Sequence, residues 1–163
     1  MTNIKKYFIY ANLLIVIVVA NILILKKENT IKRGELILLK LTPIDPRSLL
    51  QGDYMYLNYE ITRNIDNNSS KRGFLVVATN IHHVAEIVRL QPDKLPLNEG
   101  EILIKYFYNS GRYSIGSESF FFEEGHGTKF ENAIYGELKV DKLGNMVLTG
   151  LCDGSFEKIV QEK

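Results

Sequence analysis

The chain begins with one long apolar segment and continues with short segments in which apolar and polar residues alternate. Residues 7–25 are 19 residues without a charge, and a lysine pair flanks them on each side, Lys5-Lys6 and Lys26-Lys27. As a helix with a rise of about 1.5 Å per residue, this segment is about 28 Å long, close to the ~30 Å hydrocarbon core of a bilayer. It is apolar on all sides, which suits a helix surrounded by lipid. We therefore predict a transmembrane helix over residues 7–25.

A cleaved signal peptide is the alternative interpretation of this segment. Val18, Val19 and Ala20 offer small residues at which a peptidase could cut. The apolar run nevertheless continues through Leu25, which is long for the apolar core of a signal peptide. We favour an uncleaved signal anchor that exports the rest of the chain, because only six residues, two of them lysines, precede the apolar segment.

The remainder of the chain has the pattern of one mainly β domain. Short apolar or alternating segments, bounded by Gly, Pro, Asn and Asp, are typical of strands in antiparallel sheets. After a membrane anchor (1–27) and a polar linker (28–33), we expect a single antiparallel β-barrel or sandwich-like domain (34–163) with short helical turns near 45–52 and 128–134. The expected strands cover residues 36–41, 53–61, 73–79, 84–90, 101–108, 113–115, 119–122, 136–140 and 146–152.

The segment 53–61 has the clearest alternation of the expected strands. Successive side chains of a strand point to opposite faces, so this segment presents one apolar and one amphipathic face. The face expected in the core carries Met55, Leu57, Tyr59 and Ile61, and the outer face carries Tyr54, Tyr56, Asn58 and Glu60. Tyrosines on an outer face suit a groove or an interface, because the ring is apolar and the hydroxyl is polar.

Charge and cysteine content exclude several classes of protein. The whole chain has a net charge of +1, and four of its 20 basic residues flank the apolar segment, so the remainder is about −3. Such a domain lacks the basic surface of a nucleic-acid-binding protein. The single cysteine, Cys152, forms neither an intrachain disulfide nor a thiolate zinc site. We expect it to be a small buried apolar residue.

Residues 52–59 read Gly-Asp-Tyr-Met-Tyr-Leu-Asn-Tyr, that is, G-D-Y-x-x-L-x-Y. With the apolar N-terminal segment, the strand at 34–40, the P-x-D-P-R at 43–47 and a second block at 113–127, the chain resembles the bacterial GDYXXLXY family of membrane-anchored proteins. The resemblance implies an anchored domain on the outer side of the bacterial cytoplasmic membrane, often encoded beside multi-pass membrane proteins. It implies no established activity and therefore no catalytic residues.

Two groups of polar residues are candidates for a site. Asp45, Arg47 and Asp53 lie in one predicted loop, where they form either a charged rim that binds a ligand or a turn held by capping and an ion pair. The second group is acidic, and its spacing matches no standard metal-binding loop, so we predict no metal and no cofactor. Its members are Glu118, Glu123, Glu124, His126 and Glu131.

The leading hypothesis from the sequence is a non-enzymatic binding domain, an accessory partner of a multi-pass membrane protein. It would bind through the strand 53–60, with Tyr54 and Tyr56, and through the loop 120–127. The alternative is an envelope hydrolase that uses the carboxylates of Asp53, Glu118 and Glu124 together with His126. A stress or lipid sensor is a third class that the residues leave open.

Overall fold

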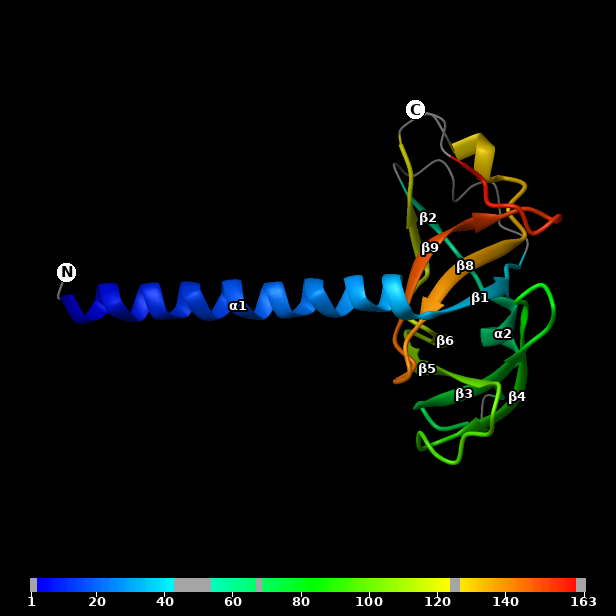
Figure 1. Ribbon diagram of the computed structural model, residues 1–163, viewed down its shortest axis with the longest axis horizontal. Coiled ribbons are helices and arrows are strands. Elements are labelled where there is room, and N and C mark those ends of the chain that lie inside the picture. The colour runs from blue at the N-terminus through cyan, green and yellow to red at the C-terminus, as the bar shows by residue number, and fades with distance from the viewer. Residues whose placement is uncertain (1–2, 43–53, 67–68, 124–126, 161–163) are drawn as a thin grey trace.

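The computed structural model consists of a long N-terminal helix and a β domain (Figure 1). It describes residues 3–42, 54–66, 69–123 and 127–160. Helix α1 (Asn3–Arg33) projects away from the domain, and its large apolar side chains between residues 7 and 25 are all exposed. Its most apolar window has a mean hydropathy of 2.7. The helix is long and apolar enough to cross a membrane. Both a membrane anchor and a signal sequence have these properties.

Residues 28–33, where the sequence predicts a polar linker, are the last turns of α1. These residues are helical because their side chains stabilise the end of the helix. Glu28 and Lys32 form an ion pair at 3.3 Å across one turn, and basic residues in the last turn suit the negative end of the helix dipole. Thr30 is buried against the domain, and its carbonyl accepts the N–H of Gly34 at 2.8 Å. The helix therefore enters the domain without an extended connection.

The described residues beyond α1 form three antiparallel sheets. The first sheet has the order β1-β8-β9, the second pairs β2 with β7, and the third has the order β4-β3-β5-β6. The strands are β1 (Glu35–Lys40), β2 (Tyr54–Tyr56), β3 (Arg72–Thr79), β4 (Ala85–Gln91), β5 (Glu101–Asn109), β6 (Arg112–Ser114), β7 (Ser119–Phe121), β8 (Tyr135–Val140) and β9 (Met146–Cys152). Two short helices complete the fold, α2 (Glu60–Arg63) and the 3₁₀ helix η2 (Gly127–Phe130).

Single backbone contacts join the sheets into a half-barrel around one core. The N–H of Leu38 in β1 donates to the carbonyl of His83 at 2.8 Å, beside β4, and the N–H of Lys105 in β5 donates to the carbonyl of Gly144 at 3.1 Å. Leu41 forms an isolated antiparallel bridge with Tyr59. The core between the sheets is apolar, and its fully buried members include Ile37, Leu39, Leu57, Leu75, Val77, Ile104, Leu138 and Leu151. The prediction of an N-terminal apolar helix followed by a mainly β, antiparallel domain is confirmed.

The segment 53–61 is a shorter strand than the sequence predicts. The described part forms β2 over only three residues, and the chain turns into α2 after Tyr59. The predicted core face is nevertheless correct, because Met55, Leu57, Tyr59 and Ile61 are all buried. The predicted helix at 128–134 is likewise reduced to η2, which ends at Phe130. The turn predicted near 45–52 lies outside the described residues.

The register of β1 and β8 gives the domain two distinct ends. Glu35, two residues beyond α1, pairs with Val140, while Lys40 at the other end of β1 pairs with Tyr135. We call the end with Glu35 and Val140 the helix-proximal end and the end with Lys40 and Tyr135 the helix-distal end. Six strand residues at about 3.3 Å each separate the two ends by about 20 Å. In Figure 1, α2 lies on the side of the domain away from α1.

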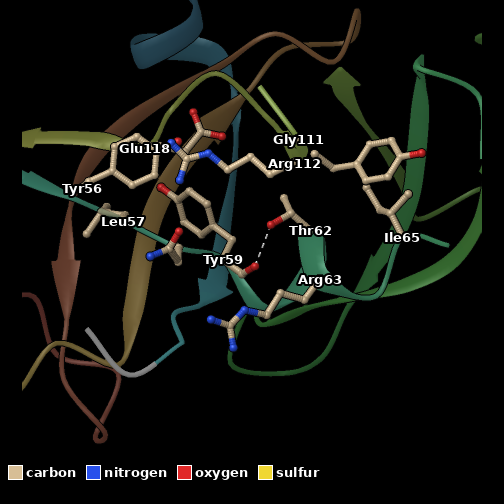
Figure 2. Close-up of a pocket in the computed structure, with 11 residues that line it drawn as sticks. Tyr56, Leu57, Tyr59, Thr62, Arg63, Ile65, Gly111, Arg112 and Glu118 are labelled. Carbon is tan, nitrogen blue, oxygen red and sulfur yellow. Dashed lines mark hydrogen bonds between the residues drawn. The ribbon is translucent and has the colours of Figure 1, made fainter. Parts of the chain in front are cut away.

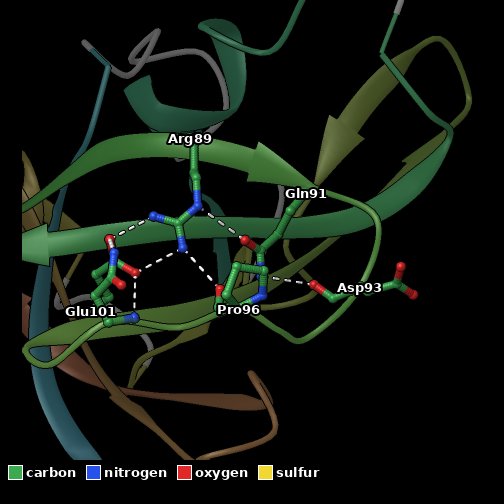
Figure 3. A network of polar contacts seen from close by, with 6 residues as sticks. Arg89, Gln91, Asp93, Pro96 and Glu101 are labelled. Atoms are coloured by element: carbon green, nitrogen blue, oxygen red, sulfur yellow. Dashed lines mark hydrogen bonds and ion pairs between the residues drawn. The ribbon is translucent and has the colours of Figure 1, made fainter.

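A polar network holds the loop between β4 and β5, which joins the helix-proximal end. Arg89 makes a two-pronged ion pair with Glu101, at 2.5 and 2.8 Å, and also donates to the carbonyl of Pro96 at 2.9 Å (Figure 3). The backbone N–H of Asn98 donates to Glu101 Oε2 at 2.8 Å. The Arg89 guanidinium and the Asn98 N–H lower the pKa of Glu101 to about 2, so the carboxylate stays charged at neutral pH.

Candidate functional site

Tyr59, the last residue of the G-D-Y-x-x-L-x-Y pattern, is buried at the helix-distal end. Its hydroxyl donates a hydrogen bond of 2.6 Å to the carbonyl of Ser117. Burial raises the pKa of this phenol far above its ordinary value, so the hydroxyl remains a proton donor. A Cβ added at Gly136 of β8 would lie 2.9 Å from the Tyr59 ring, so the ring occupies the space that a side chain would need there. Tyr59 thus connects the first sheet to the loop before β7.

Glu118 holds the same loop from the other side. Its Oε1 accepts hydrogen bonds from the hydroxyl of Ser114 (2.5 Å) and from the backbone N–H groups of Ile115 (2.6 Å) and Gly116 (3.1 Å). The carbonyl of Glu118 accepts the N–H of Leu57 at 2.6 Å. A carboxylate oxygen with three donors has a structural role in bracing the loop.

A groove of about 320 Å³ opens beside these residues. Arg112 of β6 places its guanidinium 4.5 Å from the centre of the Tyr56 ring, and Figure 2 shows Arg63 on the other side of Tyr59. Neither arginine forms an ion pair with the described residues, and both are exposed. The groove is lined by Tyr56, Leu57, Asn58, Tyr59, Thr62, Arg63, Ile65, Gly111, Arg112, Tyr113 and Glu118.

Local structure explains why the lining residues meet. The carbonyl of Tyr59 accepts the hydroxyl of Thr62 at 2.8 Å and its N–H at 3.2 Å, which closes the first turn of α2 and places Arg63 at the rim. Arg112 follows a tight turn that returns β5 into β6 through Gly111, whose φ is 87°. Burial raises the pKa of Tyr56, and nearby Glu118 adds to this effect, so the phenol at the groove is a neutral hydrogen-bonding group.

The structure brings together two of the residues predicted as a site, Tyr56 and Glu118. The backbone of Tyr54 pairs with Phe121 in the β2-β7 sheet. Asp45, Arg47, Asp53, Glu124 and His126 lie outside the described residues, so the predictions for them stay predictions. The sequence prediction did not include Arg63 and Arg112, because no local pattern connects residues that are 49 positions apart.

The predicted loop 120–127 begins at an aromatic cluster. The rings of Phe120 and Phe122 pack against the buried Phe130, with centroids 4.9 and 5.7 Å away. Phe121 of the same strand is 71% exposed. Alternate side chains of β7 thus anchor the strand or face outward, as the two faces of a strand require.

Among the described residues, no group of three or more His, Cys, Asp or Glu side chains is placed to hold a metal ion. Cys152 is 1% exposed, as predicted, and burial raises the pKa of its thiol. A buried neutral thiol is a poor nucleophile and a poor metal ligand.

Comparison with known families decides the affiliation of the chain. The family model described as "GDYXXLXY protein" matches residues 16–151. The chain belongs to the GDYXXLXY family. No curated protein and no solved structure matches it. In this GDYXXLXY domain, Leu57 and Tyr59 of the motif are buried in the core and also form part of the groove wall.

Proposed function

We propose that this GDYXXLXY protein is a single-pass, membrane-anchored binding protein, an accessory partner of a multi-pass membrane protein. Helix α1 is its anchor in the bacterial cytoplasmic membrane, and the β domain lies on the outer side. The apolar helix and the family affiliation support the anchor.

The groove carries the proposal of a binding role. Arg63 and Arg112 flank the two tyrosines at the helix-distal end and have no ion-pair partner among the described residues. The one described carboxylate of the groove, Glu118, already accepts three hydrogen bonds through Oε1. Two arginines at the rim, one of them above the Tyr56 ring, suit an acidic segment, because arginine binds carboxylates in a planar, two-pronged geometry. We therefore expect an acidic extracytoplasmic loop or terminus of the partner in this groove.

The position of the groove fits such a partner. Leu41, at the helix-distal end of β1, bridges to Tyr59, so the groove is about 20 Å of strand away from the end of α1. A loop that emerges from a neighbouring membrane protein can span this height in about six extended residues. The apolar Tyr56 ring and the exposed Phe121 provide nearby surface for aromatic contacts.

A detergent pull-down with the full-length chain tests the binding role. The variant Arg63→Glu/Arg112→Glu reverses both charges of the groove, and Arg72→Glu is the matched control, because Arg72 is an exposed arginine at the start of β3 outside the groove. A hydrogen bond to a charged group contributes about 1.5–3 kcal/mol, so we expect the double variant to retain less than about a tenth of the partner. The control should retain it in full. Equal recovery of one membrane protein by both variants would place its binding outside the groove, and recovery of none would contradict the accessory role.

A further inference from the structure

The turn between β8 and β9, at the helix-proximal end, is held by several hydrogen bonds. The carboxylate of Asp141 accepts hydrogen bonds from the N–H of Leu143 (2.8 Å) and from the N–H and side-chain amide of Asn145 (2.9 and 2.7 Å). The carbonyl of Gly144 accepts the N–H of Lys105 in β5. At the tip of this turn, Lys142 is exposed and the apolar side chain of Leu143 is 50% exposed. A rigid turn thus presents an ammonium group next to an unburied leucine.

The turn lies at the level where α1 leaves the domain. Val140, directly before the turn, pairs with Glu35, directly after the helix junction. The Nζ of Lys27 donates to the carbonyl of Met146, directly after the turn, at 3.2 Å. Figure 1 shows the same arrangement, with the end of α1 and the β8-β9 turn on one side of the domain.

Helix geometry gives the distance of the β8-β9 turn from the hydrocarbon core of the membrane. Lys27 is two residues beyond Leu25, the last residue of the apolar segment, which is about 3 Å of helix rise. The polar layer on each side of a bilayer is about 5–7 Å thick. If Leu25 lies at the edge of the hydrocarbon, the backbone of Lys27 is therefore inside the headgroup layer. The side chain of Lys27 contacts Met146, so the adjoining turn lies close to this layer.

We propose that the tip of the turn, Lys142 and Leu143, inserts into the phospholipid headgroup layer of the membrane that α1 spans. This proposal rests on the proposed anchoring of α1. The ammonium group of Lys142 contacts lipid phosphates, and Leu143 reaches the boundary between headgroups and acyl chains, where leucine and lysine are both favourable. Lys26 of α1 adds positive charge close to the same level. The tip is a second membrane contact, and together with α1 it fixes which side of the domain faces the lipid.

The chain offers a direct probe, because it contains no tryptophan. Leu143→Trp places a single indole at the tip, and the full-length chain is reconstituted into vesicles of phosphatidylethanolamine and phosphatidylglycerol with brominated lipids as quenchers. Ile81→Trp is the matched control. Ile81 is 90% exposed in the turn before Val84, which bridges to Leu38 well along β1 from the helix junction.

We expect the emission of Leu143→Trp to shift to shorter wavelength and to lose intensity with brominated lipids, while that of Ile81→Trp responds only to aqueous iodide. Lys142→Glu in the Leu143→Trp background should reduce the lipid quenching, because it reverses the charge that faces the phosphates. Vesicle flotation separates the two proposals. If the protein floats with its vesicles but the emission of Leu143→Trp is as insensitive to lipid as that of Ile81→Trp, the tip contact alone is overturned. A chain that does not float overturns both the tip contact and the anchoring.

Discussion

The two ends of the β domain are built from the same strands but differ in how they treat their charged groups. At the helix-proximal end, each acidic side chain that shapes a turn or loop is bonded, as Asp141 is by the turn residues and Glu101 is by Arg89. At the helix-distal end, Glu118 is bonded in the same way, but Arg63 and Arg112 have no ionic partner among the described residues. Bonded carboxylates therefore brace turns or loops at both ends, and two exposed arginines without an ionic partner among the described residues distinguish the groove.

The contacts of glycine sharpen this comparison. At the helix-proximal end, a Cβ on Gly34 would lie 2.3 Å from the backbone oxygen of Thr30 and 3.0 Å from that of Val140. At the helix-distal end, the three atoms nearest to a Cβ on Gly136 all belong to the side chains of Tyr59 and Leu148. The backbone atoms near Gly34 belong to a helix end and a central strand, which cannot easily move to relieve a clash. The Tyr59 ring near Gly136 can tilt.

The largest expected effect is therefore that of Gly34→Ala. Overpacking in a well-packed structure costs about 1–3 kcal/mol, and we expect about 3 kcal/mol here, because the clash is between main-chain atoms. Gly136→Ala should cost about 1–2 kcal/mol, because the Tyr59 ring can yield. Thermal unfolding of both variants in detergent measures the difference. A smaller loss for Gly34→Ala than for Gly136→Ala would show that the helix junction is loose.

The hydrogen bond of Tyr59 gives the next effect. Tyr59→Phe removes the donor to the Ser117 carbonyl, and leaving a buried acceptor without its partner costs about 1–3 kcal/mol. Tyr56→Phe is the matched control, since its ring is only partly buried and its hydroxyl has no hydrogen bond with the described residues. We expect a change within about 0.5 kcal/mol for that control in urea unfolding. Equal destabilisation by the two variants would contradict the different roles assigned to these tyrosines.

The sequence predicted the parts of the molecule that depend on local periodicity. The uncharged run predicted α1, and the alternation in 53–61 placed Leu57 and Tyr59 in the core, although the strand itself ends early. A side chain can point into the core without an extended backbone. Tyr59 does so where its carbonyl accepts the first hydrogen bond of α2. Residues 28–33 were predicted as a linker because their composition is polar, whereas the Glu28–Lys32 ion pair and the buried Thr30 show why they are helical.

The groove could not be predicted in the same way. Tyr56 was a candidate as an outer-face tyrosine of the predicted strand, and Glu118 as a member of the acidic group. Arg63 and Arg112 meet them only through the packing of α2 beside β6. The proposed binding role depends on the charge of these two arginines. Tertiary structure brings such distant residues together, and the residue types alone do not indicate that they are neighbours.

The smallest expected effect concerns pH and the helix-proximal end. Folding lowers the pKa of Glu101 from about 4.5 to about 2, chiefly through Arg89, so its contribution to stability is present above about pH 4.5 and is lost as the pH falls towards 2. Glu101→Gln should remove this contribution and flatten the acid limb of the stability curve, which unfolding experiments between pH 6 and pH 3 measure. The neighbouring Glu99→Gln is the control, because Glu99 has no hydrogen bond or ion pair with any described residue. If stability falls as steeply with acid in Glu101→Gln as in Glu99→Gln and the wild type, the Arg89 network adds nothing to folding. In that case the helix-proximal end would depend on α1 and the β8-β9 turn alone, and the contrast with the groove would rest on Asp141.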